Sequence, residues 1–150
     1  MLNDAELKDL VAYYEPEDTA AAAERWRDLF DPAATGPISL VNRFTLRARA
    51  AYDDGGHEDT RTEASGLEAF MTYAATSVPA VDRVGGRFLL SSPVVTSMFG
   101  RRDDTDLVVV GWFPNRGALL AMLRDPEYRA AYAHRRAAVA SQWVVATNAP

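Results

Sequence analysis

Apolar and polar residues follow two different periods along the chain, and these periods divide it into strand-like and helix-like segments. The segment 107–113 is apolar throughout and predicts a strand with both faces covered. Helical spacing follows over 115–123, and a second helix begins at Asp125-Pro126-Glu127. Another strand-like run, 139–145, completes a β-α-β arrangement around which the other segments can pack.

Earlier segments supply the other strands and the helix that this unit needs. Alternation over 38–50 predicts a strand with one covered face. A capping-box pattern at 65–68 begins a helix, which ends at Gly85-Gly86. The segment 87–99 predicts a second strand, whereas the polar segment 52–63 has no periodicity and predicts a loop.

The N-terminal part contains two predicted helices, 4–14 and 19–30, and is too short to enclose a core of its own. We therefore interpret 1–37 as an N-terminal helical extension of one domain that covers 38–150. The element order of that domain is β-α-β-β-α-β, which is the ferredoxin-like α+β pattern. Its helices cover one face of the sheet. The apolar second face therefore predicts a homodimer in which two sheets form a composite β-barrel.

Composition narrows the classes of function. The chain has 150 residues, a formal net charge of −5 and no cysteine. It lacks the basic face that nucleic acid or an anionic membrane requires, and no apolar run reaches the ~20 residues of a membrane span. The absence of cysteine excludes thiol catalysis, and with 2 histidines we expect no metal site. A cytoplasmic location fits this composition.

Several short motifs resemble known families. The segment Val41-Asn42-Arg43-Phe44-Thr45 is similar to the opening strand of antibiotic-biosynthesis-monooxygenase-like proteins. Other motifs resemble an uncharacterised domain-of-unknown-function family: Gly85-Gly86-Arg87-Phe88-Leu89, Val108-Val109-Val110, Phe113-Pro114, and Asp125-Pro126-Glu127-Tyr128 with Arg135. Both groups belong to the dimeric α+β barrel superfamily, and the resemblance covers about residues 38–146. The resemblance implies a dimeric α+β barrel. Members of this superfamily include cofactor-free oxygenases, haem-degrading oxygenases, isomerases, cyclases and proteins without known activity.

The haem-degrading branch is similar at one of its characteristic positions. Asn42 matches the asparagine of that branch on the first strand. Ala121 stands where that branch has a tryptophan, and Tyr132 stands where it has the histidine that binds iron. The resemblance therefore argues against haem, and we expect no cofactor.

Candidate functional residues gather on the helix that begins at Asp125-Pro126-Glu127. Tyr128, Tyr132 and Arg135 are spaced i, i+4 and i+7, so they share one helical face. Either the two rings pack with an arginine that pairs with a carboxylate or with carbonyl groups, or the three residues bind an oxygen-bearing aromatic substrate. His134 lies about 200° around the helix from Tyr132 and is either a base or a surface residue.

Asn42 is the polar member of an otherwise apolar strand face, so its amide either bonds the backbone or faces a ligand. As a catalytic hypothesis, Arg135 holds an anionic oxygen, Tyr132 transfers a proton and Asn42 orients the reacting group. The substrate-binding residues expected with them are Phe44, Tyr73, Trp112, Tyr128 and His134.

Two classes of function remain open from the sequence. The first is a cofactor-independent oxygenase, isomerase or cyclase that acts on a small aromatic or polyketide-like molecule. The second is a non-catalytic homodimer that binds a small molecule or has a structural role. A concave pocket with several polar groups would favour the first, and a filled interior would favour the second.

Overall fold

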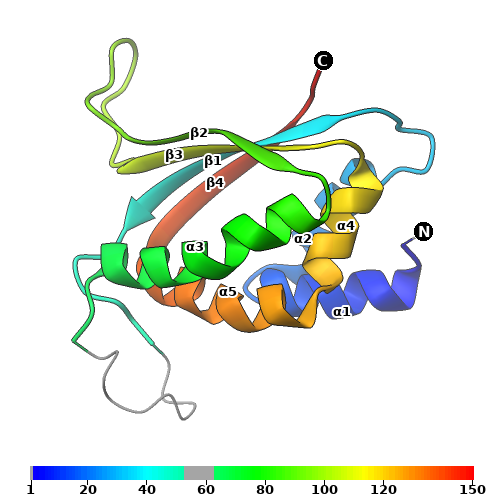
Figure 1. Cartoon of the computed structure of the whole chain (residues 1–150), viewed down its shortest axis with the longest axis horizontal. Coiled ribbons are helices and arrows are strands. Elements are labelled where there is room, and N and C mark those ends of the chain that lie inside the picture. Colours follow the sequence, from blue (N-terminus) through cyan, green and yellow to red (C-terminus); the bar gives the residue numbers. More distant parts are fainter. Residues whose placement is uncertain (1, 53–62) are drawn as a thin grey trace.

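A computed structural model describes residues 2–52 and 63–150, so most of the predicted loop 52–63 lies outside the described residues (Figure 1). The elements follow in the order α1 (Asp4–Tyr14), α2 (Thr19–Leu29), β1 (Ile38–Leu46), α3 (Gly66–Arg83), β2 (Arg87–Pro93), β3 (Leu107–Phe113), α4 (Arg116–Arg124), α5 (Pro126–Ala138) and β4 (Val139–Asn148). The predicted α+β class and ferredoxin-like order are confirmed. The first two strands are shorter than predicted, and the last strand is longer.

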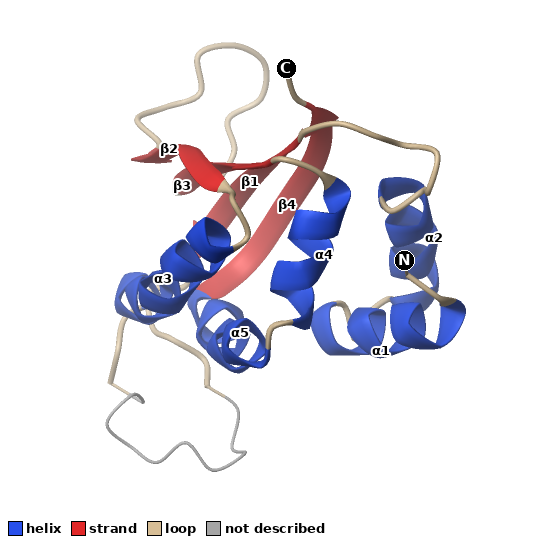
Figure 2. Cartoon of the chain, turned by 45° about the vertical axis from the view of Figure 1, so that its right-hand side comes forward, coloured by secondary structure: helices blue, strands red, loops and turns tan. Residues whose placement is uncertain are grey.

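The four strands form one antiparallel sheet in the order β2-β3-β1-β4. The central strand β1 pairs with β3 on one side and with β4 on the other, so that Asn42 lies opposite Val109 and Val144. The helices lie on one side of this sheet (Figures 1 and 2). None of the helices in residues 2–52 and 63–150 is long and apolar enough to cross a membrane.

The two faces of the sheet differ in how far they are covered. Toward the helices, Phe44, Val109 and Phe113 are buried. On the opposite face no described helix packs, and Leu90 and Trp143 remain 45% and 55% exposed. Within one chain only the helix layer covers 107–113, so the predicted cover of its second face has to come from outside the chain, as the predicted homodimer would supply it.

Helix α3 is joined closely to the sheet at both of its ends. A Cβ atom at Gly66 would lie 2.0 Å from the backbone oxygen of Arg47, just after β1. At the other end, a Cβ atom at Gly86 would lie 2.9 Å from the backbone oxygen of Trp112 on β3. Since real Cβ atoms do not approach backbone oxygens so closely, both positions require glycine, and the two contacts anchor the start of α3 and the turn that follows it.

Asp125 fixes the start of α5. Its carboxylate accepts hydrogen bonds from the backbone N–H groups of Glu127 and Tyr128 at 2.8 and 3.2 Å, and from the Arg83 side chain at 2.9 Å. These contacts join the end of α3 to the first turn of α5. They also orient the turn that carries Tyr128.

The N-terminal helices pack on the side of α4 and α5. The Tyr14 hydroxyl donates to the carbonyl of Leu123 at 2.7 Å, and Glu6 pairs with Arg124. From α4, the Arg116 side chain donates to the carbonyl of Leu29 at the end of α2, at 2.8 Å. These contacts attach both helices of the extension to the rest of the chain.

We predict that Asp125→Ala lowers the free energy of unfolding by about 1–2 kcal/mol at neutral pH, because α5 loses its N-cap. The hydrogen bond from Arg83, together with those from the Tyr128 and Glu127 backbone, lowers the pKa of Asp125. Its folded pKa is thus below its unfolded pKa. The stabilisation is present above the unfolded pKa and is lost as the pH falls through the lowered folded pKa.

Thermal unfolding of both proteins across the acid range checks this prediction, and the difference in melting temperature between them should shrink as the pH falls. Asp125→Asn is the matched control, since it retains a capping oxygen without the charge. It should lose less stability than Asp125→Ala at neutral pH. A constant difference at all pH values would contradict the role given to the carboxylate.

Candidate functional site

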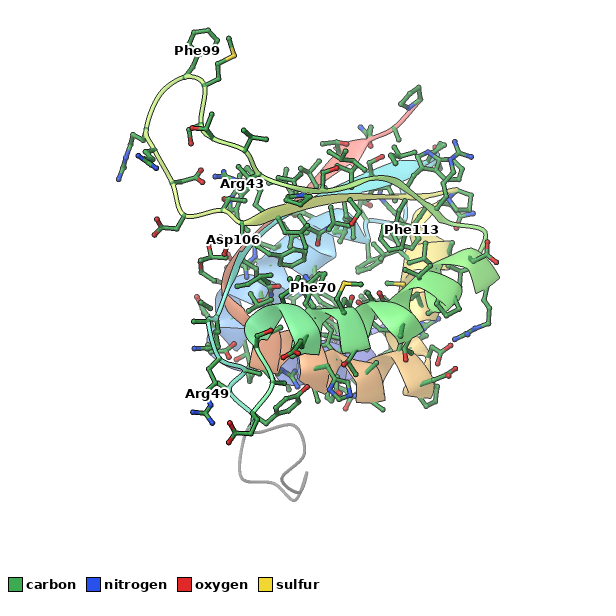
Figure 3. The ribbon with its side chains drawn as sticks, turned by 60° about the vertical axis from the view of Figure 1, so that its left-hand side comes forward. Arg43, Arg49, Phe70, Phe99, Asp106 and Phe113 are labelled. Carbon is green, nitrogen blue, oxygen red and sulfur yellow. The ribbon has the colours of Figure 1, made fainter. Side chains whose placement is uncertain are left out.

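A cavity of about 320 Å³ lies between the sheet and helices α3 and α5. Its apolar wall includes Phe70 on α3 and Phe113 on β3, which lie between the helix layer and the sheet in Figure 3. A few polar side chains also reach it: Asn42, Tyr73, Ser77, Ser91, Tyr128 and Arg135. An apolar cavity of this size with few polar groups is typical of a small-molecule site.

Arg135 is held by groups from three other elements. Its Nη1 donates to the Tyr73 hydroxyl on α3 at 3.2 Å, and its Nε and Nη2 donate to Oε1 of Gln142 on β4 at 3.1 and 2.9 Å. Nη2 also lies 3.5 Å from Oδ1 of Asn42 on β1. The guanidinium carbon is 4.8 Å from the ring centre of Phe44 and 5.1 Å from that of Tyr132.

Among the described residues, the positive charge of Arg135 has no carboxylate partner. None of the ion pairs among the described residues includes it. Burial opposes the charge, but the neighbouring hydroxyls of Tyr132, Tyr73 and Tyr128 outweigh that effect and raise the pKa of Arg135 above its ordinary value. The site therefore contains a permanent cation whose neighbours are phenols, amides and aromatic rings.

Tyr73 and Tyr128 form a buried pair of phenols. Their hydroxyl oxygens are 2.7 Å apart, and the Tyr73 hydroxyl also accepts the hydrogen bond from Arg135. Burial and the proximity of Tyr73 raise the pKa of Tyr128 well above its ordinary value. Tyr128 is therefore a neutral phenol at physiological pH, and it can donate a hydrogen bond or a proton but does not act as a base.

Asn42 combines the two roles that the sequence left open. Its Nδ2 donates to the carbonyl oxygens of Leu40 and Val109 at 3.2 and 3.1 Å. These bonds fix the amide, so that Oδ1 faces the guanidinium of Arg135. Asn42 is thus bonded to the backbone and also lines the cavity.

The structure brings together five of the predicted site residues around the cavity, which are Asn42, Phe44, Tyr73, Tyr128 and Arg135. Tyr132 contacts Arg135 from the other side and lines a separate groove instead. His134 also lies away from the cavity, where its Nδ1 is 2.7 Å from the Tyr52 hydroxyl.

Trp112 requires a correction. It does not line the cavity, because Val109, Gly111 and Phe113 are the residues of β3 that face the helices. Alternation along the strand places Trp112 on the opposite face, where the Arg87 guanidinium lies 4.3 Å from its ring centre.

Gln142 is a functional candidate that the sequence did not single out. It lies opposite Phe44 on β4, and its Oε1 accepts two hydrogen bonds from Arg135. Period-two alternation over 139–148 places Gln142 on the same face as Val144 and Ala146, so a polar residue on an apolar strand face was the available signal.

The site contains no evident metal centre. Across residues 2–52 and 63–150, no three His, Asp or Glu side chains gather in a way that could hold a metal ion. The groups that reach the cavity are hydroxyls, amides and a guanidinium, which suit an anionic or carbonyl oxygen of an organic ligand.

Comparisons with known proteins add a family and a fold. The family model described as "Domain of unknown function (DUF1330)" matches residues 60–149. A solved structure of a protein of unknown function from Rhodopseudomonas palustris is 31% identical, with a TM-score of 0.74, and the match covers 85% of this chain and 92% of that one. No curated protein matches significantly.

Two more distant solved structures are also similar. A dimeric ferredoxin-like protein of unknown function from Thermobifida fusca is 19% identical, with a TM-score of 0.47 and coverage of 76% of this chain and 92% of that one. A candidate antibiotic biosynthesis monooxygenase from Caulobacter crescentus is 14% identical, with a TM-score of 0.48 and coverage of 84% and 98%.

We predict that Tyr128→Phe lowers the free energy of unfolding by about 1–3 kcal/mol, because Tyr73 loses its buried hydroxyl partner. The matched variant is Tyr132→Phe on the same helix. Among the described residues, its hydroxyl has a single long hydrogen bond, with Gln142 at 3.5 Å, so its loss should change stability by less than about 0.5 kcal/mol. Chemical denaturation of both variants measures the difference. Equal losses would show that the hydrogen bond between Tyr73 and Tyr128 stabilises the fold no more than the Tyr132 hydroxyl does.

Proposed function

We propose a function from the geometry of the site, because the chain belongs to the DUF1330 family, whose function is unknown. This membership confirms the resemblance noted in the sequence. The chain is a small-molecule enzyme of the cofactor-independent isomerase, cyclase or oxygenase type. Its substrate is an aromatic or polyketide-like molecule that carries an anionic or enolisable oxygen. The ring system binds in the cavity between the sheet and α3, and the oxygen binds at Arg135.

One observation carries this proposal, namely the cation of Arg135 at the wall of an apolar cavity without a carboxylate partner among the described residues. A partly desolvated charge without a counterion costs several kcal/mol in folding. An anionic ligand would supply the missing counterion. Its apolar part would be enclosed by residues such as Phe70 and Phe113.

The chemistry follows from the groups that surround the oxygen. In an enolate or phenolate, negative charge develops on oxygen, and a fixed guanidinium and phenol stabilise it without reorganisation. Toward a substrate that binds already ionised as its enolate, Tyr128, with its raised pKa, would act as a general acid: its O–H bond breaks, the proton passes to the enolate carbon, and the phenolate takes a proton from water, which leaves as hydroxide. Tyr73 would relay the hydrogen bond between Tyr128 and Arg135.

A second candidate is a binding protein that performs no reaction. It is favoured by the absence of any Asp, Glu or His among the described residues that line the cavity, since no conventional base is present there. The two candidates share the ligand and the role of Arg135. Turnover of an enolisable ligand distinguishes them, because a binding protein would leave it unchanged.

We predict that Arg135→Gln weakens the binding of 1-hydroxy-2-naphthoate at least about tenfold, because a charge-assisted hydrogen bond contributes about 1.5–3 kcal/mol. Isothermal titration calorimetry measures the change. Arg136→Gln is the control, since that neighbouring arginine is exposed and does not line the cavity. Unchanged binding in Arg135→Gln, or an equal loss in both variants, would contradict the proposal.

We also propose that the chain forms a homodimer through the face of the sheet that carries no described helix. That face presents Val41, Val108, Val110 and Leu90 beside Trp143, and an exposed apolar patch of this kind usually marks an interface. Two copies that meet through this face would bury it without a second layer of helices.

Light scattering at micromolar concentration should therefore give about twice the chain mass of 16.5 kDa. Leu90→Asp should shift the mass toward that of a single chain, because it places a charge in the interface. The matched control is Leu67→Asp on α3, where the leucine is 57% exposed on the helix layer. A monomeric wild type, or dissociation by the control alone, would exclude this interface.

A further inference from the structure

A second and larger space adjoins the cavity on the side of the N-terminal helices. It is an open groove of about 700 Å³ bounded by α1, α2, α4, α5 and β4. Figure 2 shows α4 and the two N-terminal helices on this side of the molecule. We call it the N-terminal groove. The wall formed by Tyr14 on α1 and Trp26 on α2 is supplied by the extension.

The cavity and the N-terminal groove share a common wall. The residues that line both are Leu40, Asn42, Met122, Tyr128 and Arg135. Arg135 is therefore accessible from two directions. Its contact with Oδ1 of Asn42, at 3.5 Å, is the longest of its hydrogen bonds, and both residues belong to the common wall.

The two spaces differ in chemistry. The cavity is enclosed mainly by aromatic and aliphatic side chains. The groove, in contrast, is lined by many hydrogen-bonding groups, including Glu15, Arg25, Asp28, Arg116, Gln142 and Asn148. Arg116 is fixed by bonds to the Leu29 carbonyl at 2.8 Å and to Oδ1 of Asn148 at 3.1 Å, so the polar end of the groove is well ordered.

We propose that the N-terminal groove binds an oxygenated tail of the substrate whose ring occupies the cavity. This inference rests on the proposed function and names its substrate class more closely. The substrate has an aromatic or cyclic head, an anionic oxygen held at Arg135, and a polar, oxygen-bearing chain attached next to that oxygen. The N-terminal helices thus contribute a specificity subsite.

Two matched probes test this inference. The short probe is N-methyl-1-hydroxy-2-naphthamide, and the long probe is the amide of the same acid with a triethylene-glycol amine. Both have the same ring and phenol, and they differ only in a polar tail that leaves from the oxygen-bearing end. We expect the long probe to bind the wild type about tenfold more tightly than the short probe, because the tail gains contacts in the groove.

Two variants separate the two spaces. Val144 lines only the groove and is 40% exposed, so Val144→Trp should abolish the advantage of the long probe and leave the short probe unchanged. Val78 lines only the cavity and is 50% exposed, so Val78→Trp should weaken both probes by the same factor. Thermal unfolding confirms that each variant is folded.

The failure of this inference can be distinguished from the failure of the proposed function. If the short probe binds through Arg135 but the tail adds no affinity, the groove subsite is excluded and the proposed function stands. If 1-hydroxy-2-naphthoate binds through Arg135 but neither amide probe binds, only the groove subsite is excluded. If 1-hydroxy-2-naphthoate does not bind, or if Arg135→Gln leaves its binding unchanged, both are excluded. A crystal structure with the long probe gives an independent result: the glycol chain should lie along Val144, and a tail in bulk solvent would overturn the subsite.

Discussion

The organisation of the site depends on holding the positive charge of Arg135 at the wall of an apolar cavity with no carboxylate partner among the described residues. A buried ion loses several kcal/mol of hydration, and a salt bridge is the usual compensation. Arg135 instead has two phenols, two amides and several ring faces around it. These dipoles stabilise the cation but do not neutralise it. The charge is therefore still available to an anion, which a salt bridge would prevent.

This arrangement explains why the site draws on so many parts of the chain. The guanidinium comes from α5, and its partners come from α3, β1 and β4, so no single segment contains the site. The partners are fixed in turn: Asn42 bonds the carbonyl oxygens of Leu40 and Val109, and Tyr73 bonds the hydroxyl of Tyr128. Asp125 and Arg83 fix the helix that carries the charge relative to α3. Precise placement of this kind is what a preorganised oxyanion site requires.

Much of the fold and of the candidate site could be predicted from the sequence, because local periodicity indicates which face of a helix or strand is covered. The spacing of Tyr128, Tyr132 and Arg135, and the polar Asn42 on an apolar face, indicated most of the cluster. Trp112 was misplaced because 107–113 is apolar on both faces, so alternation could not indicate which set faces the helices. The sequence hypothesis gave the proton transfer to Tyr132, and our proposal gives it to Tyr128, because both lie on one helical face and only packing decides which of them reaches the cavity.

The close backbone contacts of Gly66 and Gly86 affect how the shape of the cavity responds to substitutions. Gly66, the first residue of α3, lies against the backbone of Arg47 just after β1, and Gly86, in the turn after α3, lies against the backbone of Trp112 on β3, so main-chain contacts anchor both ends of the helix. When a side chain in that layer is shortened, these contacts limit how far the helix can move to fill the space. The lost volume is added to the cavity. Accordingly, the interior can be reshaped one residue at a time while its walls stay in place, which makes this scaffold suited to the engineering of new ligand preferences.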